Sequence, residues 1–230
     1  MMNKIHQHLL SLQDQKYRDF NAKIITQKHY PMIGVRLPEI RKYAKELIKE
    51  NQLPDFENSY YEEVLLHGMC IGRYKCDFKE KIKLIESFLP LINDWSICDS
   101  FVSSLKDINK HTDEYLPYIR KYIKTNKEFY QRYGFVVLLN YYKEEKYLEE
   151  IFKHIKTTKY NGYYSQMASA WLLSYMFMYF YDETLDFVGV NKIDEFVLLK
   201  GIQKAIDSYR LIDKQKDELR KLRNAYRQGK

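Results

Sequence analysis

Residues 37–48 read Leu37-Pro38-Glu39-Ile40-Arg41-Lys42-Tyr43-Ala44-Lys45-Glu46-Leu47-Ile48, and this stretch decides the class of fold. Its apolar side chains recur three and four residues apart, which is the spacing of one face of an α-helix. Pro38 fits the first turn of a helix, where no backbone N–H needs a partner within the helix. The stretch therefore predicts an amphipathic helix that begins near Leu37.

The same spacing predicts helices along the rest of the chain. One bent helix or two short ones fit residues 5–26. The other helices cover residues 59–74, 78–89, 95–105, 114–125, 127–142, 146–156, 163–181, 192–209 and 213–228. Gly (8) and Pro (5), which interrupt helices, are scarce. No stretch convincingly predicts a strand, so we expect an all-α protein.

A longer spacing suggests how these helices are arranged. Trp95, Arg132, Trp171 and Arg210 follow one another at intervals of 37, 39 and 39 residues. Paired helices of HEAT type repeat at about 40 residues. We therefore expect a single domain over residues 1–230, a right-handed α-solenoid of HEAT-like repeats. These side chains would line its concave groove, where an elongated polyanion fits.

Composition favours an anionic partner. The formal net charge is +7 and the isoelectric point is about 9.0, which attracts nucleic acid first and acidic membranes second. Aromatic residues make up 16% of the chain, with 22 tyrosines. Aromatic rings on a basic surface can stack on bases, although most of these tyrosines are expected to pack between helices.

Several classes of protein are disfavoured. Cys70, Cys76 and Cys98 form no disulfide framework, which is typical of a reducing compartment. The most apolar run, residues 168–181, is too short to span a bilayer. The six histidines show no metal-ligand spacing, and no Gly-rich nucleotide loop is present. We expect a cytoplasmic protein without metal or cofactor.

The sharpest chemical pattern is Asn93-Asp94-Trp95-Ser96-Ile97-Cys98-Asp99. Asn93 or Asp94 fits the N-cap of a helix. Trp95 and Asp99 would then lie one turn apart on one face. Together a ring face and a carboxylate can stabilise a cationic, electron-poor group. A core Trp beside a solvated Asp is the alternative interpretation.

Two further residues have functional and structural interpretations. Arg132 precedes an apolar helix body, where it can hold a phosphate or form a salt bridge with Glu128. Trp171 follows the small residues of Ser165–Ala170, so it is either a cleft residue or a core Trp.

These segments together resemble the bacterial DNA alkylation repair proteins of the AlkD type, which are built from HEAT-like repeats. The resemblance covers nearly the whole chain. The segments that carry it are Gly34–Arg41, Asn93–Asp99, Phe129–Val137, Tyr164–Leu173 and Ile202–Ile206.

The resemblance implies a DNA glycosylase that removes N3- or N7-alkylated purines from duplex DNA, without metal, cofactor or base flipping. Asp99 would be the catalytic carboxylate, and Trp95, Arg132 and Trp171 would bind the substrate. Such a protein would act as a monomer in the cytoplasm, in association with the nucleoid.

Two other functions stay open. One is a non-catalytic solenoid that binds distorted or branched DNA, because Ser174 and Tyr175 stand where strongly active family members carry a basic residue. The other is a helical scaffold that binds proteins. The scaffold hypothesis predicts no salt-dependent DNA binding.

Overall fold

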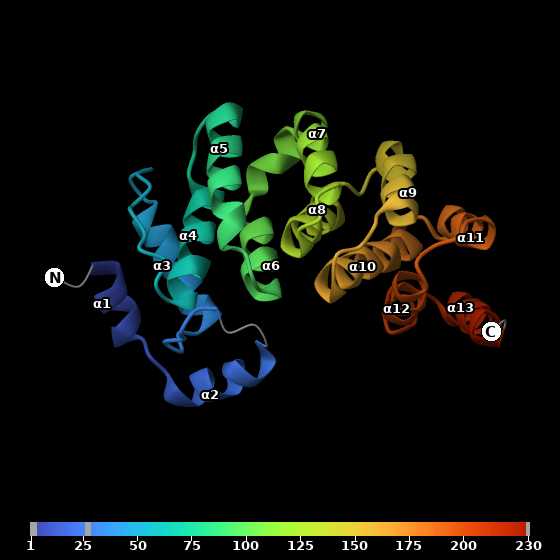
Figure 1. Ribbon diagram of the computed structural model, residues 1–230, viewed down its shortest axis with the longest axis horizontal. Coiled ribbons are helices and arrows are strands. Elements are labelled where there is room, and N and C mark those ends of the chain that lie inside the picture. The colour runs from blue at the N-terminus through green and yellow to red at the C-terminus, as the bar shows by residue number, and fades with distance from the viewer. Residues whose placement is uncertain (1–3, 26–28, 229–230) are drawn as a thin grey trace. The chain divides into compact units, whose positions relative to one another are not determined.

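The structure is a computed structural model that describes residues 4–25 and 29–228 (Figure 1). Over these residues it contains thirteen α-helices, three short 3-10 turns and no strand. The prediction of an all-α protein is therefore confirmed. The chain forms two compact units that divide between His111 and Thr112, and each unit is described by itself.

The first unit is built around one buried helix, α4. Its helices are α1 (Lys4–Ser11), α2 (Gln15–Ile24), α3 (Leu37–Leu47), α4 (Tyr61–Arg73), α5 (Phe78–Phe88) and α6 (Trp95–Ser104). Helix α4 packs against α1, α3, α5 and α6. All of its residues except His67 and Arg73 are buried, as expected for a helix at the centre of a core.

The first turn of α4 carries two buried carboxylates that hold neighbouring segments in place. Glu62 accepts hydrogen bonds from the backbone N–H groups of Ile33, Gly34 and Val35, at 2.9, 2.7 and 3.3 Å. Glu63 lies 2.8 Å from Nδ1 of His6 on α1. A buried carboxylate is stable only with such partners. The loop before α3 and helix α1 are therefore both anchored to α4.

Two glycines allow segments of this unit to approach closely. Gly34 has a φ of +98°, which favours glycine, and a Cβ atom there would lie 2.6 Å from the carbonyl oxygen of Asp14. Gly72 of α4 lies against α6, where a Cβ atom would overlap the side chain of Ser104. The close contact of α4 with α6 therefore depends on the absence of a side chain at residue 72.

The second unit is a succession of packed helices. They are α7 (Thr112–Ile123), α8 (Glu128–Tyr141), α9 (Leu148–Thr157), α10 (Tyr163–Tyr179), α11 (Tyr181–Val190), α12 (Glu195–Ile206) and α13 (Asp213–Gln228). Helix α10 lies between α8 and α12, while α7 packs on α8 and α13 on α12. Successive packing of this kind is consistent with helical repeats. The right-handed solenoid itself stays a prediction.

Of the two arrangements predicted for residues 5–26, one bent helix or two short ones, the structure has the second, as α1 and α2. The predicted end at residue 26 lies outside the described residues. Helix α11 was not predicted at all. It buries only Thr184, Phe187 and Val188, which is too few apolar positions to give a clear helical period.

The length and apolar character of the described helices can be compared with what a membrane span requires. Among residues 4–25 and 29–228, no helix combines the length and the apolar character needed to cross a bilayer.

His67 is a partly buried histidine on the otherwise buried helix α4. Its ring stacks on Phe56, with ring centroids 4.5 Å apart, and meets the edge of Phe88 at 5.2 Å. Its Nδ1 lies 2.9 Å from Oδ1 of Asn58. Burial lowers the pKa of His67 to about 4, because the apolar surroundings disfavour the charged ring.

We predict that His67 makes the protein less stable in mild acid. The unfolded chain binds a proton at His67 near pH 6.5, whereas the folded chain does so only near pH 4. Stability is therefore lost as the pH falls from 6.5 to 4, by up to about 3 kcal/mol. Urea unfolding at several pH values should show a flatter profile for His67→Gln over this window. If His67→Gln and wild type lose stability equally between pH 6.5 and 4, His67 is not the cause of the loss.

Candidate functional site

The start of α6 is fixed by a fully buried carboxylate, Asp94. Its Oδ1 accepts the backbone N–H of Ser96 at 2.7 Å and the hydroxyl of Tyr61, on α4, at 3.1 Å. The side chain is 0% exposed, and burial raises the pKa of Asp94. Asp94 is therefore the N-cap, one of the two residues that the sequence suggested, and it also joins α6 to α4.

This cap determines where Trp95 and Asp99 lie. They occupy the first and second turns of α6, four residues apart, and both are partly exposed. Other side chains of α6 enter the core, namely Ile97, Cys98, Phe101 and Val102. The predicted Trp–Asp face therefore exists within the first unit, and neither side chain is a fully buried core residue.

A partly exposed indole beside a carboxylate suits one kind of ligand chemistry. The face of an indole ring attracts a cation, and a nearby carboxylate stabilises positive charge that develops during a reaction. The pair needs no metal or cofactor to do either.

The second unit holds the other two predicted residues, Arg132 and Trp171. Arg132 is only 6% exposed, and its Nη1 donates to the carbonyl oxygen of Tyr164 at 3.1 Å. Its guanidinium also lies over the Tyr164 ring, 5.9 Å from the centroid. Glu128, the residue that the sequence offered as its partner, accepts the backbone N–H of Tyr164. Both side chains therefore hold the first turn of α10.

Trp171 belongs to an aromatic stripe along α10. We define this aromatic stripe as Tyr164, Trp171, Tyr175 and Tyr179, which recur at helical spacing on one side of the helix. The Trp171 and Tyr175 ring centroids are 6.1 Å apart, and those of Tyr175 and Tyr179 are 6.0 Å apart. Trp171 is partly exposed, and Tyr179 is 40% exposed. The stripe therefore offers ring surface to a ligand.

Every ring of the aromatic stripe has a cation within 6 Å. Besides Arg132 at Tyr164, Lys204 of α12 lies 5.8 Å from the centroid of Trp171. Lys143 lies 5.7 and 5.8 Å from Tyr175 and Tyr179. Arg210 lies 5.4 Å from Tyr179 and donates to its hydroxyl at 2.6 Å. Rings that alternate with cations can stack on bases and contact phosphates.

The sequence could reveal only part of this stripe. Tyr175 and Tyr179 follow Trp171 at four-residue intervals, and this spacing is the signal that marks them in the sequence. Lys143 and Lys204 come from other segments of the unit, so no local pattern marks them. Ser174 is buried and donates to the carbonyl oxygen of Trp171 at 2.7 Å. Position 174 therefore points into the core, and the cations beside Trp171 come from elsewhere.

Metal ligands and reactive thiols are two other kinds of group that could carry chemistry. Within the described part of the chain, no group of three His, Cys, Asp or Glu side chains could hold a metal ion. Burial raises the pKa of the Cys70 thiol to about 12, so it stays protonated at neutral pH and is a poor nucleophile.

Comparisons with known proteins give one clear result. The model of a protein family described as DNA alkylation repair enzyme matches residues 5–208. That range includes Trp95, Asp99, Arg132 and the aromatic stripe. No match was found among curated proteins.

We predict that Asp94 stabilises the protein more than an ordinary exposed N-cap. Asp94→Ala removes the cap and the buried partner of the Tyr61 hydroxyl, so we expect a loss of about 2 to 3 kcal/mol. Asp77→Ala is the control, because Asp77 caps α5 at the surface; it should lose about 1 kcal/mol. Urea unfolding followed by circular dichroism measures both, and equal losses would contradict the prediction.

Proposed function

Because the chain belongs to the DNA alkylation repair enzyme family, we propose that it is a DNA glycosylase that hydrolyses the N-glycosidic bond of N3- or N7-alkylated purines in duplex DNA. The observation that carries this proposal is the Trp95–Asp99 face, a partly exposed carboxylate one helical turn from a partly exposed indole. Asp99 is the proposed catalytic residue, and Trp95 is a proposed substrate-binding residue.

The chemistry of the substrate explains why so few groups are needed. An N7-alkylated purine already carries positive charge, so it can leave without being protonated by a general acid. The barrier lies in the sugar, which becomes an oxocarbenium-like cation as the bond breaks. The Asp99 carboxylate stabilises that cation and positions or deprotonates the attacking water. The Trp95 ring face favours a positively charged nucleotide over a neutral one.

The aromatic stripe is the proposed DNA-contacting surface of the second unit. Trp171 and the tyrosines supply flat faces, and Lys143, Lys204 and Arg210 supply the charge that attracts phosphates. Arg132 is mostly buried against Tyr164. It therefore acts in this proposal chiefly by holding α10 in place and secondarily by its positive charge.

The remaining parts of the proposal follow from the resemblance noted in the sequence. The two units would belong to one right-handed HEAT-like solenoid whose groove receives duplex DNA. The lesion would be excised without being flipped into a pocket, in contrast to the usual strategy of glycosylases. The protein would work as a monomer in the cytoplasm, near the nucleoid.

A second candidate function is binding of distorted or branched DNA without excision. Two observations favour it: the buried position of Ser174 and the 6% exposure of Arg132. Neither residue can offer a phosphate the open contact that a basic residue at the surface would give. This candidate shares the aromatic stripe but leaves Asp99 without a chemical role.

We predict that Asp99→Asn abolishes most base release. Single-turnover release of 7-methylguanine from duplex DNA should fall by about two orders of magnitude, because a main electrostatic catalyst is lost. Binding of the same duplex should be nearly unchanged. Asp77→Asn is the matched control, since Asn caps a helix as well as Asp does, and it should keep wild-type activity. Equal release by wild type and Asp99→Asn would remove Asp99 from the mechanism.

We predict that the cations of the aromatic stripe account for part of the salt dependence of DNA binding. Lys143→Gln with Lys204→Gln should weaken duplex binding and lower the slope of log affinity against log salt by about 2. The control pair is Lys79→Gln with Lys83→Gln, two exposed lysines on α5. Both pairs remove the same charge, so identical slopes would show that the stripe does not contact phosphates.

A further inference from the structure

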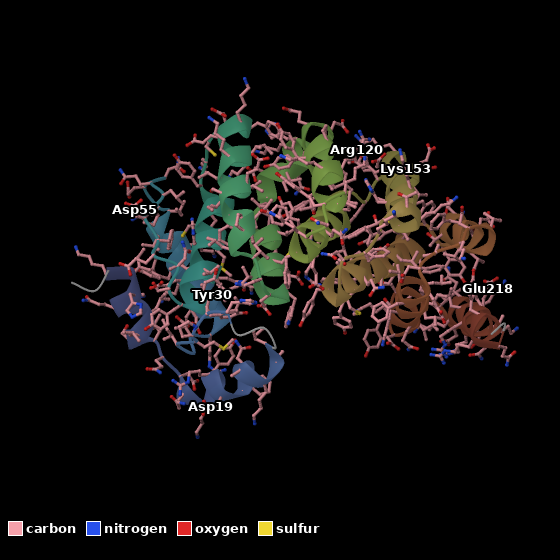
Figure 2. The ribbon with its side chains drawn as sticks, in the orientation of Figure 1. Asp19, Tyr30, Asp55, Arg120, Lys153 and Glu218 are labelled. Carbon is pink, nitrogen blue, oxygen red and sulfur yellow. The ribbon has the colours of Figure 1, made fainter. Side chains whose placement is uncertain are left out.

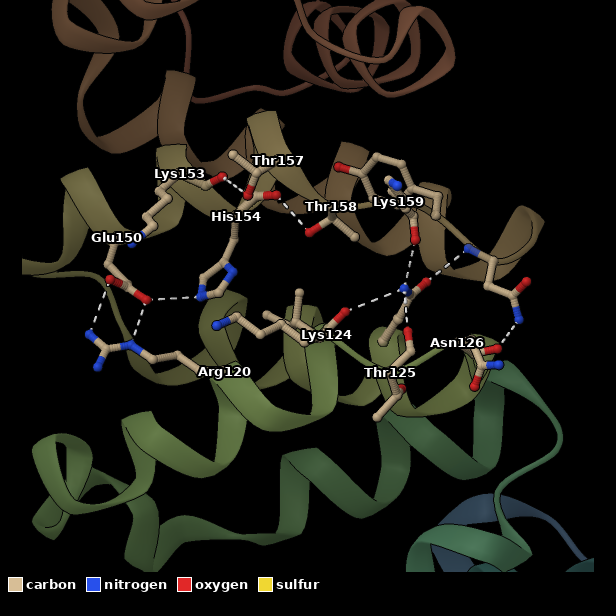
Figure 3. A pocket seen from close by; sticks show the side chains of 14 residues that line it. Arg120, Lys124, Thr125, Asn126, Glu150, Lys153, His154, Thr157, Thr158 and Lys159 are labelled. Atoms are coloured by element: carbon tan, nitrogen blue, oxygen red, sulfur yellow. Dashed lines mark hydrogen bonds and ion pairs between the residues drawn. The ribbon is translucent and has the colours of Figure 1, made fainter.

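A concave basic pocket lies in the second unit, between α7 and α9, away from the rings of the aromatic stripe. Its volume is about 740 Å³, which is within the size range of small-ligand sites. Figure 2 shows Arg120 on α7 and Lys153 on α9, and Figure 3 shows the pocket from close by. The walls come from the end of α7, from α9, and from the loops that follow each of these helices.

The charge of this pocket is strongly positive. Its charged lining residues are Arg120, Lys124, Glu150, Lys153 and Lys159. Arg120 binds Glu150 with two hydrogen bonds of 2.7 and 3.1 Å, and these bonds lower the pKa of Glu150. The negative charge of Glu150 is therefore neutralised by Arg120 within the pocket wall. The three lysines leave the pocket with a net positive charge.

These three lysines are available to a ligand. Lys124, Lys153 and Lys159 are exposed. Glu150, the acidic residue of this lining, forms its ion pairs with Arg120 and His154, and Lys153 attracts it only through space. Three ammonium groups around one hollow repel one another, and a multivalent anion relieves that repulsion. Thr157 and Asn126 add polar groups to the same lining, which also includes Ile123 and Tyr160.

The loops that form the pocket are held together by a buried amide. Gln131 is 1% exposed. Its Nε2 donates to the carbonyl oxygens of Thr125 and Lys159, both at 2.9 Å, and its Oε1 accepts the N–H of Asn161, also at 2.9 Å. This side chain joins the loop after α7 to the loop after α9. Lys124 and Lys159 are thereby attached to one rigid frame, which reduces the entropy lost when a ligand binds.

We propose that this pocket binds a phosphate-bearing anion. Phosphate oxygens are strong acceptors for ammonium groups, and a group with two or more negative charges matches the three lysines. The phosphate can come from a free molecule such as pyrophosphate or from the backbone of bound DNA. Binding at this pocket does not depend on Asp99 or on base excision.

The test uses the full-length protein with two triple variants of equal charge. The pocket variant is Lys124→Gln, Lys153→Gln and Lys159→Gln. The control is Lys75→Gln, Lys79→Gln and Lys83→Gln, three exposed lysines of the first unit. Isothermal titration with sodium pyrophosphate at low salt should show one site per chain. The pocket variant should bind it at least ten-fold more weakly, whereas the control should stay within two-fold of wild type.

A second arm identifies the source of the phosphate. If DNA enters the pocket, the salt-dependence slope for an unmodified duplex falls by about 3 in the pocket variant alone. If the ligand is a free molecule, pyrophosphate binding is lost while the two variants keep the same DNA slope. Either result supports a phosphate site. Identical behaviour of the two variants in both arms would overturn the proposal.

Discussion

The carboxylate of Asp94 is the constraint on which the proposed active site depends. It satisfies the first turn of α6 and accepts the hydroxyl of Tyr61 on the central helix α4. Because this side chain is fully buried, it can adopt few other positions. Trp95 and Asp99 lie in the first two turns of the helix that Asp94 caps, so their orientation is set by a hydrogen bond inside the core rather than by contacts at the surface. A catalytic carboxylate needs this kind of support, since small displacements weaken electrostatic stabilisation.

Buried polar side chains at the beginnings of helices do the same work elsewhere. Glu62 and Glu63 hold the loop before α3 and helix α1 in the first unit. In the second unit, Gln131 joins the loop before α8 to the loop before α10, and the partly buried Glu128 accepts a backbone N–H in the first turn of α10. Each one satisfies backbone groups of irregular segments that would otherwise be buried without partners. The helices are therefore joined by specific hydrogen bonds as well as by apolar packing, and the surfaces that carry function stand on a rigid frame.

The structural features that the sequence predicted correctly are those set by residues close together in the chain. The helical class, the cap at Asp94 and the shared face of Trp95 and Asp99 all follow from spacings of four residues or fewer. Contacts between distant residues could not be found in this way. The bond of Arg132 to the Tyr164 carbonyl spans 32 positions, and Lys204 reaches Trp171 from a different helix. Helix α11 was not predicted because it buries so few side chains that its sequence shows no clear helical period. The single-domain solenoid and the roles of the four predicted site residues stay predictions.

Two chemical demands are met by separate groups in this chain. Cations, on the aromatic stripe and around the pocket, attract a polyanion regardless of its sequence. In the proposed mechanism, the carboxylate of Asp99 instead acts on a cation, the oxocarbenium-like sugar of an alkylated nucleotide. The central claim is that the protein not only attracts DNA but also stabilises the cationic sugar and so releases the base. The most direct measurement is the rate at which wild-type protein frees 7-methylguanine from a duplex with a single N7-methylguanine, compared with spontaneous loss from the same duplex. The account predicts a rate far above the spontaneous one, with an abasic site left behind. A rate equal to the spontaneous one, from DNA that the protein has fully bound, would contradict it.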